Sequence, residues 1–418
     1  MTPSASLRFD GGDIMQKCVY LDNNATTRVP EAVVDVMKPY FGDIYFNPSS
    51  MYERAKLSSS ALEQSRKTIA QFIGAKQRSE ILFTSCATES NNTAIRGATM
   101  ANPTRKHIIT TQVEHPAVLA LCEQLEREGY EITRIGVNQR GELDMKAFVK
   151  ALRPNETLLV SIMYANNETG VIFPIERLSQ IVKATDPRIL FHTDATQAVA
   201  KIPIDLSHEL EHVDFLSFSG HKIHAPKGIG VLYIRKGAAC RPFLYGGHQE
   251  SGRRGGTENI PYIVALAKAC ELAQDAFEQE SRLVALRDKL ELGLQQIPYV
   301  VINGQGAQRL PNTVNVAFHC IEGEGILYQL DLEGICASSG SACTSGSLDP
   351  SHVLHAMHVP FTAVHGSIRF SMSRETTEEE IDHVLEVMPK IVHNLRKLSP
   401  YWDQEKQCPR GEALIIEK

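Results

Sequence analysis

Short apolar runs alternate with amphipathic stretches between about Glu80 and Arg235, and this alternation constrains the fold more than any other feature. Apolar runs rich in β-branched and aromatic side chains predict strands. Because apolar strands that alternate with helices form parallel sheets covered on both faces, we expect a largely parallel sheet. The predicted strands are 81–84, 107–111, 157–163, 189–192, 215–218 and 230–234, with amphipathic helices at 117–128 and 175–183.

The pattern changes after about Phe277, and the change predicts a second domain. We expect a helix at 282–296, short strands at 313–318 and 367–371, and closing helices after them. Residues 376–380 resemble a capping box at the start of the first closing helix. The predicted division is a disordered lead-in at 1–18, a large α/β domain at 31–277, and a smaller α+β domain made of 19–30 and 278–418.

Charge and apolar content exclude two classes of function. The 418-residue chain carries a formal charge of −6, so it lacks the basic footprint expected of a nucleic-acid-binding protein. No apolar run approaches the roughly 20 residues that a membrane-spanning helix needs, and we expect a cytoplasmic protein. The nine cysteines are odd in number and contain no C-x-x-C pair, which argues against a disulfide framework.

Two strands end in polar clusters that offer complementary groups. The run 191–197 offers the carboxylate of Asp194, and the run 215–222 offers the amine of Lys222. Ligands bind at the carboxyl ends of strands in open α/β sheets, so both clusters could face one site. Pyridoxal phosphate (PLP) uses such a pair, a lysine and an acid beside the pyridinium nitrogen. Taken singly, each residue could equally be a solvated strand end or a turn.

A strand-to-helix junction at 83–90 is a candidate phosphate site. Small and hydroxyl residues there, including Ala87 and Thr88, leave the amides of the first helical turn open to an anion. Ser219 and His221 could close the other side of such a phosphate. The alternative for 83–90 is an ordinary N-cap, which Ser and Thr commonly provide.

Further candidates lie near other strand ends. His115 could stack on a flat ring or shuttle protons, and Asn167 lies in a stretch, 166–170, that is either a turn or a set of ligand contacts. Arg369, with Ile368 and Phe370 on the opposite face of a strand, could bind a carboxylate. Cys343, in the Ser/Gly-rich run 338–347, suits a mobile nucleophile. Each of these also has an ordinary structural explanation.

Two glycine- or histidine-containing motifs carry less weight. The run 246–257 lacks the spacing of the known nucleotide-binding loops, although it could help to hold a phosphate. His208 and His212 fit the H-E-x-x-H zinc-protease pattern. Because little more than two helical turns fit between Pro203 and the strand at Phe215, we predict a surface turn there instead.

Together these motifs resemble the cysteine desulfurases of the nitrogen-fixation (NifS) type, which are class-V aminotransferases of PLP fold type I. The resemblance runs from Tyr20 to Trp402 and rests on ordered motifs at 20–27, 47–50, 87–89, 194–197, 219–222 and 338–345. It implies a large domain with a mostly parallel sheet flanked by helices, plus a smaller α+β domain. It assigns no role to the residues before Val19 or after Trp402.

The resemblance also implies roles around the cofactor. Lys222 would hold PLP covalently, Asp194 would pair with the pyridinium nitrogen, and His115 would stack on the ring and help to move protons. Thr257 would reach the phosphate of the neighbouring subunit, which implies a homodimer. The polar edge of the ring and the phosphate would be held by Ala87 (through its backbone), Thr88, Asn167, Gln197, Ser219, His221 and Thr257.

The implied substrate is L-cysteine, with its carboxylate on Arg369 and Asn24 lining the same pocket. Cys343 would take up the sulfur as a persulfide, leave L-alanine, and pass the sulfur to a NifU-like iron–sulfur scaffold, for nitrogenase or for general cluster assembly. No intrinsic metal is implied, apart from a transient contact of that persulfide with an iron–sulfur cluster. The alternatives are a selenocysteine lyase, another PLP-dependent aminotransferase-like enzyme, or a non-catalytic sulfur or metal carrier that uses Cys343 alone.

Overall fold

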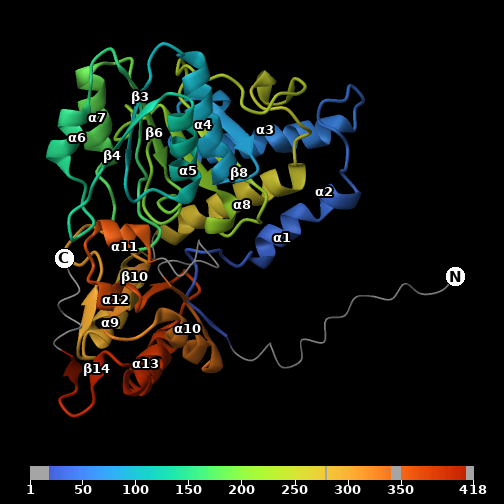
Figure 1. The fold of residues 1–418 in the computed structure, drawn as a ribbon. Coiled ribbons are helices and arrows are strands. Elements are labelled where there is room, and N and C mark those ends of the chain that lie inside the picture. Colours follow the sequence, from blue (N-terminus) through green and yellow to red (C-terminus); the bar gives the residue numbers. More distant parts are fainter. Residues whose placement is uncertain (1–17, 278–279, 340–349, 411–418) are drawn as a thin grey trace.

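The computed structural model describes residues 18–277, 280–339 and 350–410. A seven-stranded sheet lies at the centre of the larger part (Figure 1). Its strand order is β2-β8-β7-β6-β5-β3-β4, and every neighbouring pair is parallel except the two that involve β8. The strands are β2 (Ile81–Thr84), β3 (His107–Thr111), β4 (Glu131–Ile135), β5 (Thr157–Ser161), β6 (Leu190–Asp194), β7 (Phe215–Ser219) and β8 (Gly230–Ile234). The predicted, largely parallel sheet is therefore confirmed.

One strand of this sheet, β4, was not predicted from the sequence. It pairs with β3 at the edge of the sheet and is only partly buried, with polar residues Glu131, Thr133 and Arg134 in its short length. An edge strand with a solvated face lacks the adjacent apolar residues from which the other strands were predicted.

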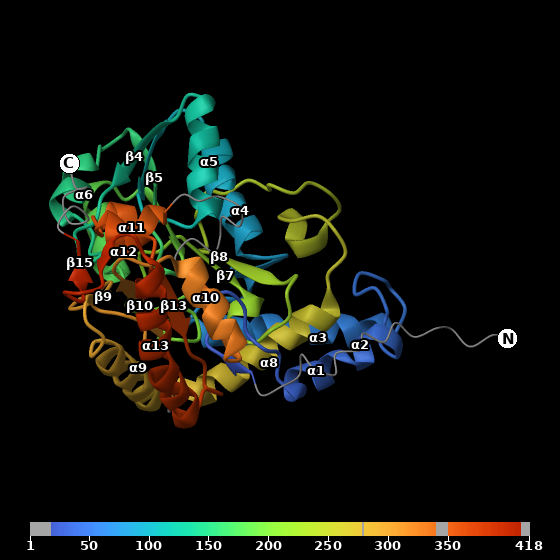
Figure 2. The same cartoon turned by 60° about the horizontal axis from the view of Figure 1, so that its bottom comes forward.

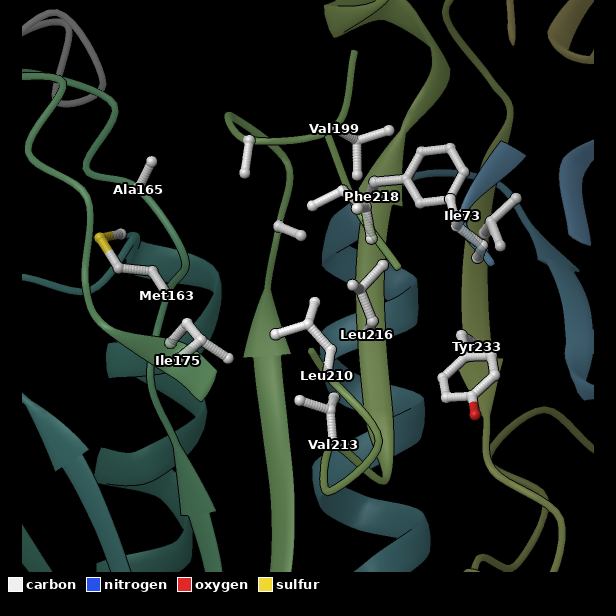
Figure 3. Close-up of a cluster of buried hydrophobic side chains, with 14 of the residues drawn as sticks. Ile73, Met163, Ala165, Ile175, Val199, Leu210, Val213, Leu216, Phe218 and Tyr233 are labelled. Atoms are coloured by element: carbon white, nitrogen blue, oxygen red, sulfur yellow. The ribbon is translucent and has the colours of Figure 1, made fainter. Parts of the chain in front are cut away.

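Helices cover both faces of this sheet, as alternate buried side chains along its strands require. In β8, Leu232 packs into a cluster under α4 and α5, whereas Val231 and Tyr233 belong to the larger cluster on the other face. Figure 3 shows part of that larger cluster. The helices of this part are α1 (Glu31–Met37), α2 (Pro39–Gly42), α3 (Ala55–Phe72), α4 (Ala87–Ala101), α5 (Pro116–Arg127), α6 (Met145–Ala151), α7 (Ile175–Thr185) and α8 (Ile260–Ala276).

A second sheet and its helices lie to one side of the first (Figure 2). The sheet has the order β12-β13-β10-β9 and is antiparallel throughout. Its separate apolar core takes residues from the N-terminal segment, Val19 and Leu21, as well as from the C-terminal third of the chain. The elements are β9 (Val300–Ile302), β10 (Thr313–Phe318), β12 (Ser338–Ser339), β13 (Ser367–Ser371), α9 (Glu280–Leu294), α10 (Gly323–Leu332), α11 (His352–Ala356), α12 (Phe361–Val364) and α13 (Glu378–Leu398).

The N-terminal segment joins this second part through a short parallel strand pair, β1 (Val19–Tyr20) with β11 (Ile335–Cys336). The predicted capping box begins α13, where Thr377 Oγ1 accepts from the Glu380 amide and the Glu380 side chain accepts in return. The separate clusters support the predicted two-domain division, which stays a prediction. Val353, Leu354 and Val364 of α11 and α12 pack into the larger cluster although they lie within 278–418.

The residues after α13 form a hairpin that the sequence left unplaced. Strands β14 (Trp402–Asp403) and β15 (Cys408–Pro409) pair, and the Arg396 guanidinium lies 4.3 Å from the centre of the Trp402 ring. Such a cation–π contact fixes the hairpin against α13. Among the ranges that the structure describes, no helix is both long and apolar enough to cross a membrane.

Candidate active site

A cavity of about 950 Å³, including its open mouth, lies where the carboxyl ends of the central strands meet. This volume falls in the usual range for small-molecule and cofactor sites. The cavity brings together every residue that the sequence suggested for cofactor or substrate except Thr257 and Cys343. The suggested residues that line the cavity are Asn24, Ala87, Thr88, His115, Asn167, Asp194, Gln197, Ser219, His221, Lys222 and Arg369.

The two exceptions have different reasons. Cys343 lies outside the described residues. Thr257 follows a 3-10 turn, η3 (Gln249–Gly252), and does not line the cavity of its own chain. That turn is held by a buried, bidentate ion pair in which Arg66 donates to both oxygens of Glu250, at 2.7 and 2.8 Å.

Lys222 reaches the cavity from the end of β7, in the turn η2 (Gly220–Lys222). Its Nζ donates hydrogen bonds to the carbonyl oxygens of Asn24 and Ala25, at 2.8 and 2.7 Å. Gly220 permits this turn, because a Cβ there would meet Ile229 Cγ2 at 2.7 Å. The N-terminal segment after β1 therefore supplies the carbonyls that orient the lysine.

Asp194 ends β6 and is oriented by two donors. Asn91 Nδ2 of α4 donates to Oδ2 at 2.6 Å, and the Thr196 amide donates to Oδ1 at 3.0 Å. The sequence prediction missed Asn91. Its position three residues after Thr88, on one face of α4, was a signal that could have identified it.

The start of α4 offers donors for an anion. Its N-cap residue, Cys86, makes no side-chain capping bond, so no cap occupies the first-turn amides beside Ala87 and Thr88. Strand β8 passes close to this turn, and a Cβ on Gly230 would lie 2.7 Å from the Cys86 carbonyl carbon. A helix N-terminus with open amides is well suited to a phosphate.

His115 is the N-cap of α5, and its Nδ1 accepts a hydrogen bond from the Ala117 amide at 3.1 Å. Nδ1 must then carry the lone pair, so the neutral ring bears its proton on Nε2. Burial lowers the pKa of His115, which keeps the ring neutral. Burial and the neighbouring Lys222 likewise lower the pKa of His221, to about 4.

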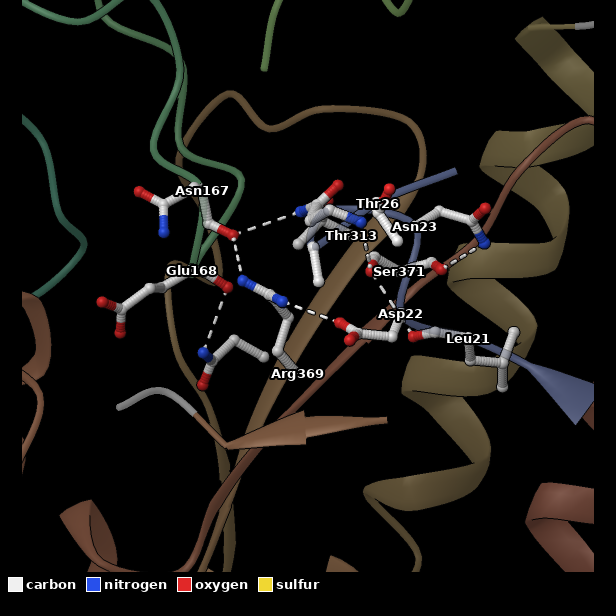
Figure 4. Close-up of polar contacts among 12 residues, drawn as sticks. Leu21, Asp22, Asn23, Thr26, Asn167, Glu168, Thr313, Arg369 and Ser371 are labelled. Atoms are coloured by element: carbon white, nitrogen blue, oxygen red, sulfur yellow. Dashed lines mark hydrogen bonds and ion pairs between the residues drawn. The ribbon is translucent and has the colours of Figure 1, made fainter. Parts of the chain in front are cut away.

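Arg369, on β13 of the second sheet, contacts the turn that carries Asn167 and the N-terminal segment at Asp22 (Figure 4). Its Nη1 donates to the Asn167 carbonyl at 3.0 Å and its Nη2 to Asp22 Oδ1 at 2.8 Å. Ile368 and Phe370, its neighbours on β13, point into the smaller core, as the alternation predicted. The buried Nε has no partner among the described residues, so the guanidinium retains a donor.

Three more buried polar atoms in the cavity lack partners among the described residues: Asn91 Oδ1, Thr196 Oγ1 and Ser219 Oγ. A buried polar atom without a partner costs about 1–3 kcal/mol, so these atoms indicate a polar ligand. A lysine, a carboxylate, open helix amides and a neutral imidazole around one cavity match a planar, phosphorylated ring. The residues present therefore fit PLP.

The stretch 206–212, which carries the H-E-x-x-H pattern, forms turns, as predicted, and not a helix. His208 is exposed and bonds Asp205 Oδ2 at 2.8 Å. Its position on a turn leaves it without the shared helix face that the zinc-protease pattern requires.

Two buried acids beside the site were not predicted, although both lie in motifs that the sequence singled out. Glu114 precedes His115 and accepts hydrogen bonds from Thr111 Oγ1 and the Met163 amide, at 2.8 and 2.9 Å. Glu168 follows Asn167 and accepts from Ser351 Oγ at 2.5 Å. Burial raises the pKa of Glu114 to about 8 and that of Glu168 to about 7. Burial of a single acid cannot be read from a motif.

The raised pKa of Glu114 makes folding stability depend on pH. The folded chain keeps this acid protonated up to about pH 8, whereas the unfolded chain ionises it above about pH 4.3. Stability should therefore fall by about 1.4 kcal/mol for each pH unit between these values. Glu114→Gln, which cannot ionise, should make that slope less steep by this amount in urea unfolding measured at about pH 5, 6.5 and 8, while Glu168 keeps its own contribution below about pH 7. The exposed Glu123→Gln serves as control, and an unchanged slope in Glu114→Gln contradicts this account.

Comparison with known proteins agrees with the site. The model of the class-V aminotransferase family matches residues 19–384. Cysteine desulfurase 2 of Trichormus variabilis is 53% identical over 95% of this chain and 99% of its own length. Cysteine desulfurase NifS of Azotobacter vinelandii is 53% identical over 92% of this chain and 95% of its own length.

Solved structures give the same result. A NifS-like protein superposes with a TM-score of 0.84 at 38% identity, over 90% of this chain and all of the other. SspA, solved in complex with cysteine, gives a TM-score of 0.74 at 34% identity, over 84% and 98% of the two chains. Enzymes of this family use PLP. The chain belongs to the class-V aminotransferase family and, within it, to the cysteine desulfurases.

Proposed function

We propose that this chain is a PLP-dependent cysteine desulfurase, which converts L-cysteine to L-alanine and keeps the sulfur as a persulfide on Cys343. The observation that carries the proposal is the single cavity in which Lys222, Asp194 and Arg369 meet. Identity of more than 50% to cysteine desulfurases across nearly the whole chain supports the same activity.

PLP, when bound, supplies an electron sink that stabilises negative charge on the substrate carbons. Lys222 would hold it and, once the substrate amine has taken its place, would accept the Cα proton. Asp194, oriented by Asn91, would keep the pyridinium nitrogen protonated. His115 would stack on the ring with its Nε2 proton available for donation. The α4 amides, Thr88, Ser219 and His221 would hold the phosphate, with Thr257 of the partner subunit.

Arg369 and Cys343 would act on the substrate itself. The Nε of Arg369, which has no partner among the described residues, would orient the α-carboxylate, with Asn24 beside it. The Cys343 thiolate would attack the substrate sulfur, so that an S–S bond forms as the C–S bond breaks. The electron pair of that bond stays with the carbon skeleton, which takes up protons and leaves as L-alanine. An external thiol would then reduce the persulfide and release sulfide.

The homodimer stays a proposal, and two features support it. The Arg66–Glu250 ion pair fixes the loop that carries Thr257. Large apolar side chains are exposed near that loop and around α2 and α3, among them Phe41, Tyr45, Met51, Tyr52, Phe243 and Tyr245. A cytoplasmic location, a NifU-like scaffold as sulfur acceptor, and a role in nitrogen fixation are proposed on the family resemblance alone.

Product analysis tests the central activity. The purified protein should be yellow with PLP, and with L-cysteine and a reductant it should release L-alanine and sulfide in equal amounts. Cys343→Ser should keep the visible band and lose sulfide release, because only the acceptor thiol is removed, whereas Cys408→Ser should behave like the parent. Sulfide release by Cys343→Ser equal to that of the parent would favour a lyase, and a yellow parent protein that releases no sulfide would favour an aminotransferase-like reaction. A protein that stays colourless after PLP addition would favour the carrier.

The role of Arg369 is tested by comparing substrates with and without a carboxylate. Hydrogen bonds to a charged group contribute about 1.5–3 kcal/mol, so Arg369→Gln should lower kcat/KM for L-cysteine roughly 10- to 150-fold. The parent should prefer L-cysteine strongly to cysteamine, which lacks the carboxylate, and Arg369→Gln should lose most of that preference. A variant that is slower with both compounds by the same factor would show that Arg369 acts only on the structure.

A further inference from the structure

Two cysteines distant in sequence meet beside the short strand pair that joins the N-terminal segment to the smaller sheet. The sulfur atoms of Cys18 and Cys336 lie 3.4 Å apart, although 318 positions separate them in the chain. Cys18 immediately precedes β1, and Cys336 ends β11. Neither residue lines the cavity described above.

Strand geometry explains why these thiols meet. Val19, Leu21 and Ile335 point into the smaller apolar core, so Cys18, Tyr20 and Cys336 face the other way. Tyr20 lies opposite Cys336, and the Val19 amide donates to the Gly334 carbonyl at 2.9 Å. Position 334 therefore lies beside Cys18. Because it is a glycine, no side chain fills the space between Cys18 and Cys336.

The two thiols differ in exposure. Cys18 is exposed, whereas Cys336 is partly covered. Burial and the adjacent Cys18 raise the pKa of Cys336, so its thiol is a poorer first nucleophile. Forming a disulfide by exchange needs an exposed thiol, which reacts first and forms a mixed disulfide, and a second thiol beside it, which then attacks that mixed disulfide.

We propose that Cys18 and Cys336 form a site of reversible oxidation, at which a low-molecular-weight disulfide converts the dithiol to an intramolecular disulfide. Closing the gap from 3.4 Å to the roughly 2.0 Å of an S–S bond requires the two side chains to turn toward each other beside a strand pair that is already formed. The site is separate from sulfur transfer at Cys343 and does not depend on it.

The reaction balances without a metal or a further oxidant. The Cys18 thiolate attacks the disulfide RSSR, forms a mixed disulfide Cys18–S–SR, and releases one thiolate RS⁻. The Cys336 thiolate then attacks Cys18 Sγ, forms the Cys18–Cys336 bond, and releases the second RS⁻. Two protein thiols are oxidised by two electrons, and one small disulfide is reduced to two thiols. Excess small thiol reverses both steps.

The bond would act on segments that reach the active site. After β1 the chain continues to Asp22, which pairs with Arg369, and to Asn24 and Ala25, whose carbonyls hold Lys222. After β11 it continues to β12, where Ser338 pairs with Arg369. A disulfide here would close a very long loop in the unfolded chain and would therefore raise the melting temperature.

Mass spectrometry of the full-length, PLP-loaded protein tests the proposal. The protein is equilibrated with glutathione disulfide and glutathione at graded ratios, quenched in acid and digested with pepsin. We expect a peptide containing Cys18 linked to one containing Cys336, removed by dithiothreitol, together with a melting temperature raised by several degrees. Fragment ions distinguish Cys336 from Cys343 in the linked peptide.

Three variants make the test decisive. Cys336→Ser should leave glutathione attached to Cys18, because the resolving thiol is gone, and Cys18→Ser should show neither the link nor the rise in melting temperature. Cys408→Ser should match the parent. Stable glutathione on Cys18 in the parent, a link from Cys18 to another cysteine, or an equal rise in melting temperature in Cys18→Ser would each overturn the proposal.

Discussion

The hydrogen bonds from Lys222 Nζ to the carbonyls of Asn24 and Ala25 are the interaction on which the rest of the site depends. Lys222 lies in the turn after β7 of the larger sheet, whereas Asn24 and Ala25 continue from a strand paired with the smaller part. The same segment contacts Arg369 through Asp22. One short stretch of backbone thus orients both the amine that would hold the cofactor and the guanidinium that would hold the substrate.

The polar network around this segment explains how two separate cores make one site. Asn24 Nδ2 donates to the Asn167 carbonyl at 3.2 Å and to Thr313 Oγ1 at 2.9 Å, so it connects a turn of the larger part with β10 of the second sheet. Arg369 reaches the same Asn167 carbonyl from β13. Because these buried hydrogen bonds come from both parts of the molecule, they place the substrate-binding group relative to the lysine without a large shared apolar core.

Sequence reasoning was reliable where one local pattern decides the outcome. The buried strands β2, β3, β7 and β8 each contain adjacent apolar residues, and Lys222 and Asp194 lie at strand ends where ligands bind. It was unreliable where the outcome depends on a distant partner. Asn91 matters because it contacts Asp194, Glu168 because it is buried against Ser351, and Cys18 because Cys336 lies beside it. None of these pairs is close in sequence.

The most direct measurement is to identify the amine that holds PLP. Borohydride reduction of the yellow protein makes that linkage permanent, and peptide mass spectrometry then locates it. The account predicts a single labelled lysine, Lys222. Lys201 is the informative rival, because burial keeps the pKa of this amine well below its usual value and its Nζ bonds Gln197 in the neighbouring turn. Label on Lys201, or on no lysine, would contradict the account.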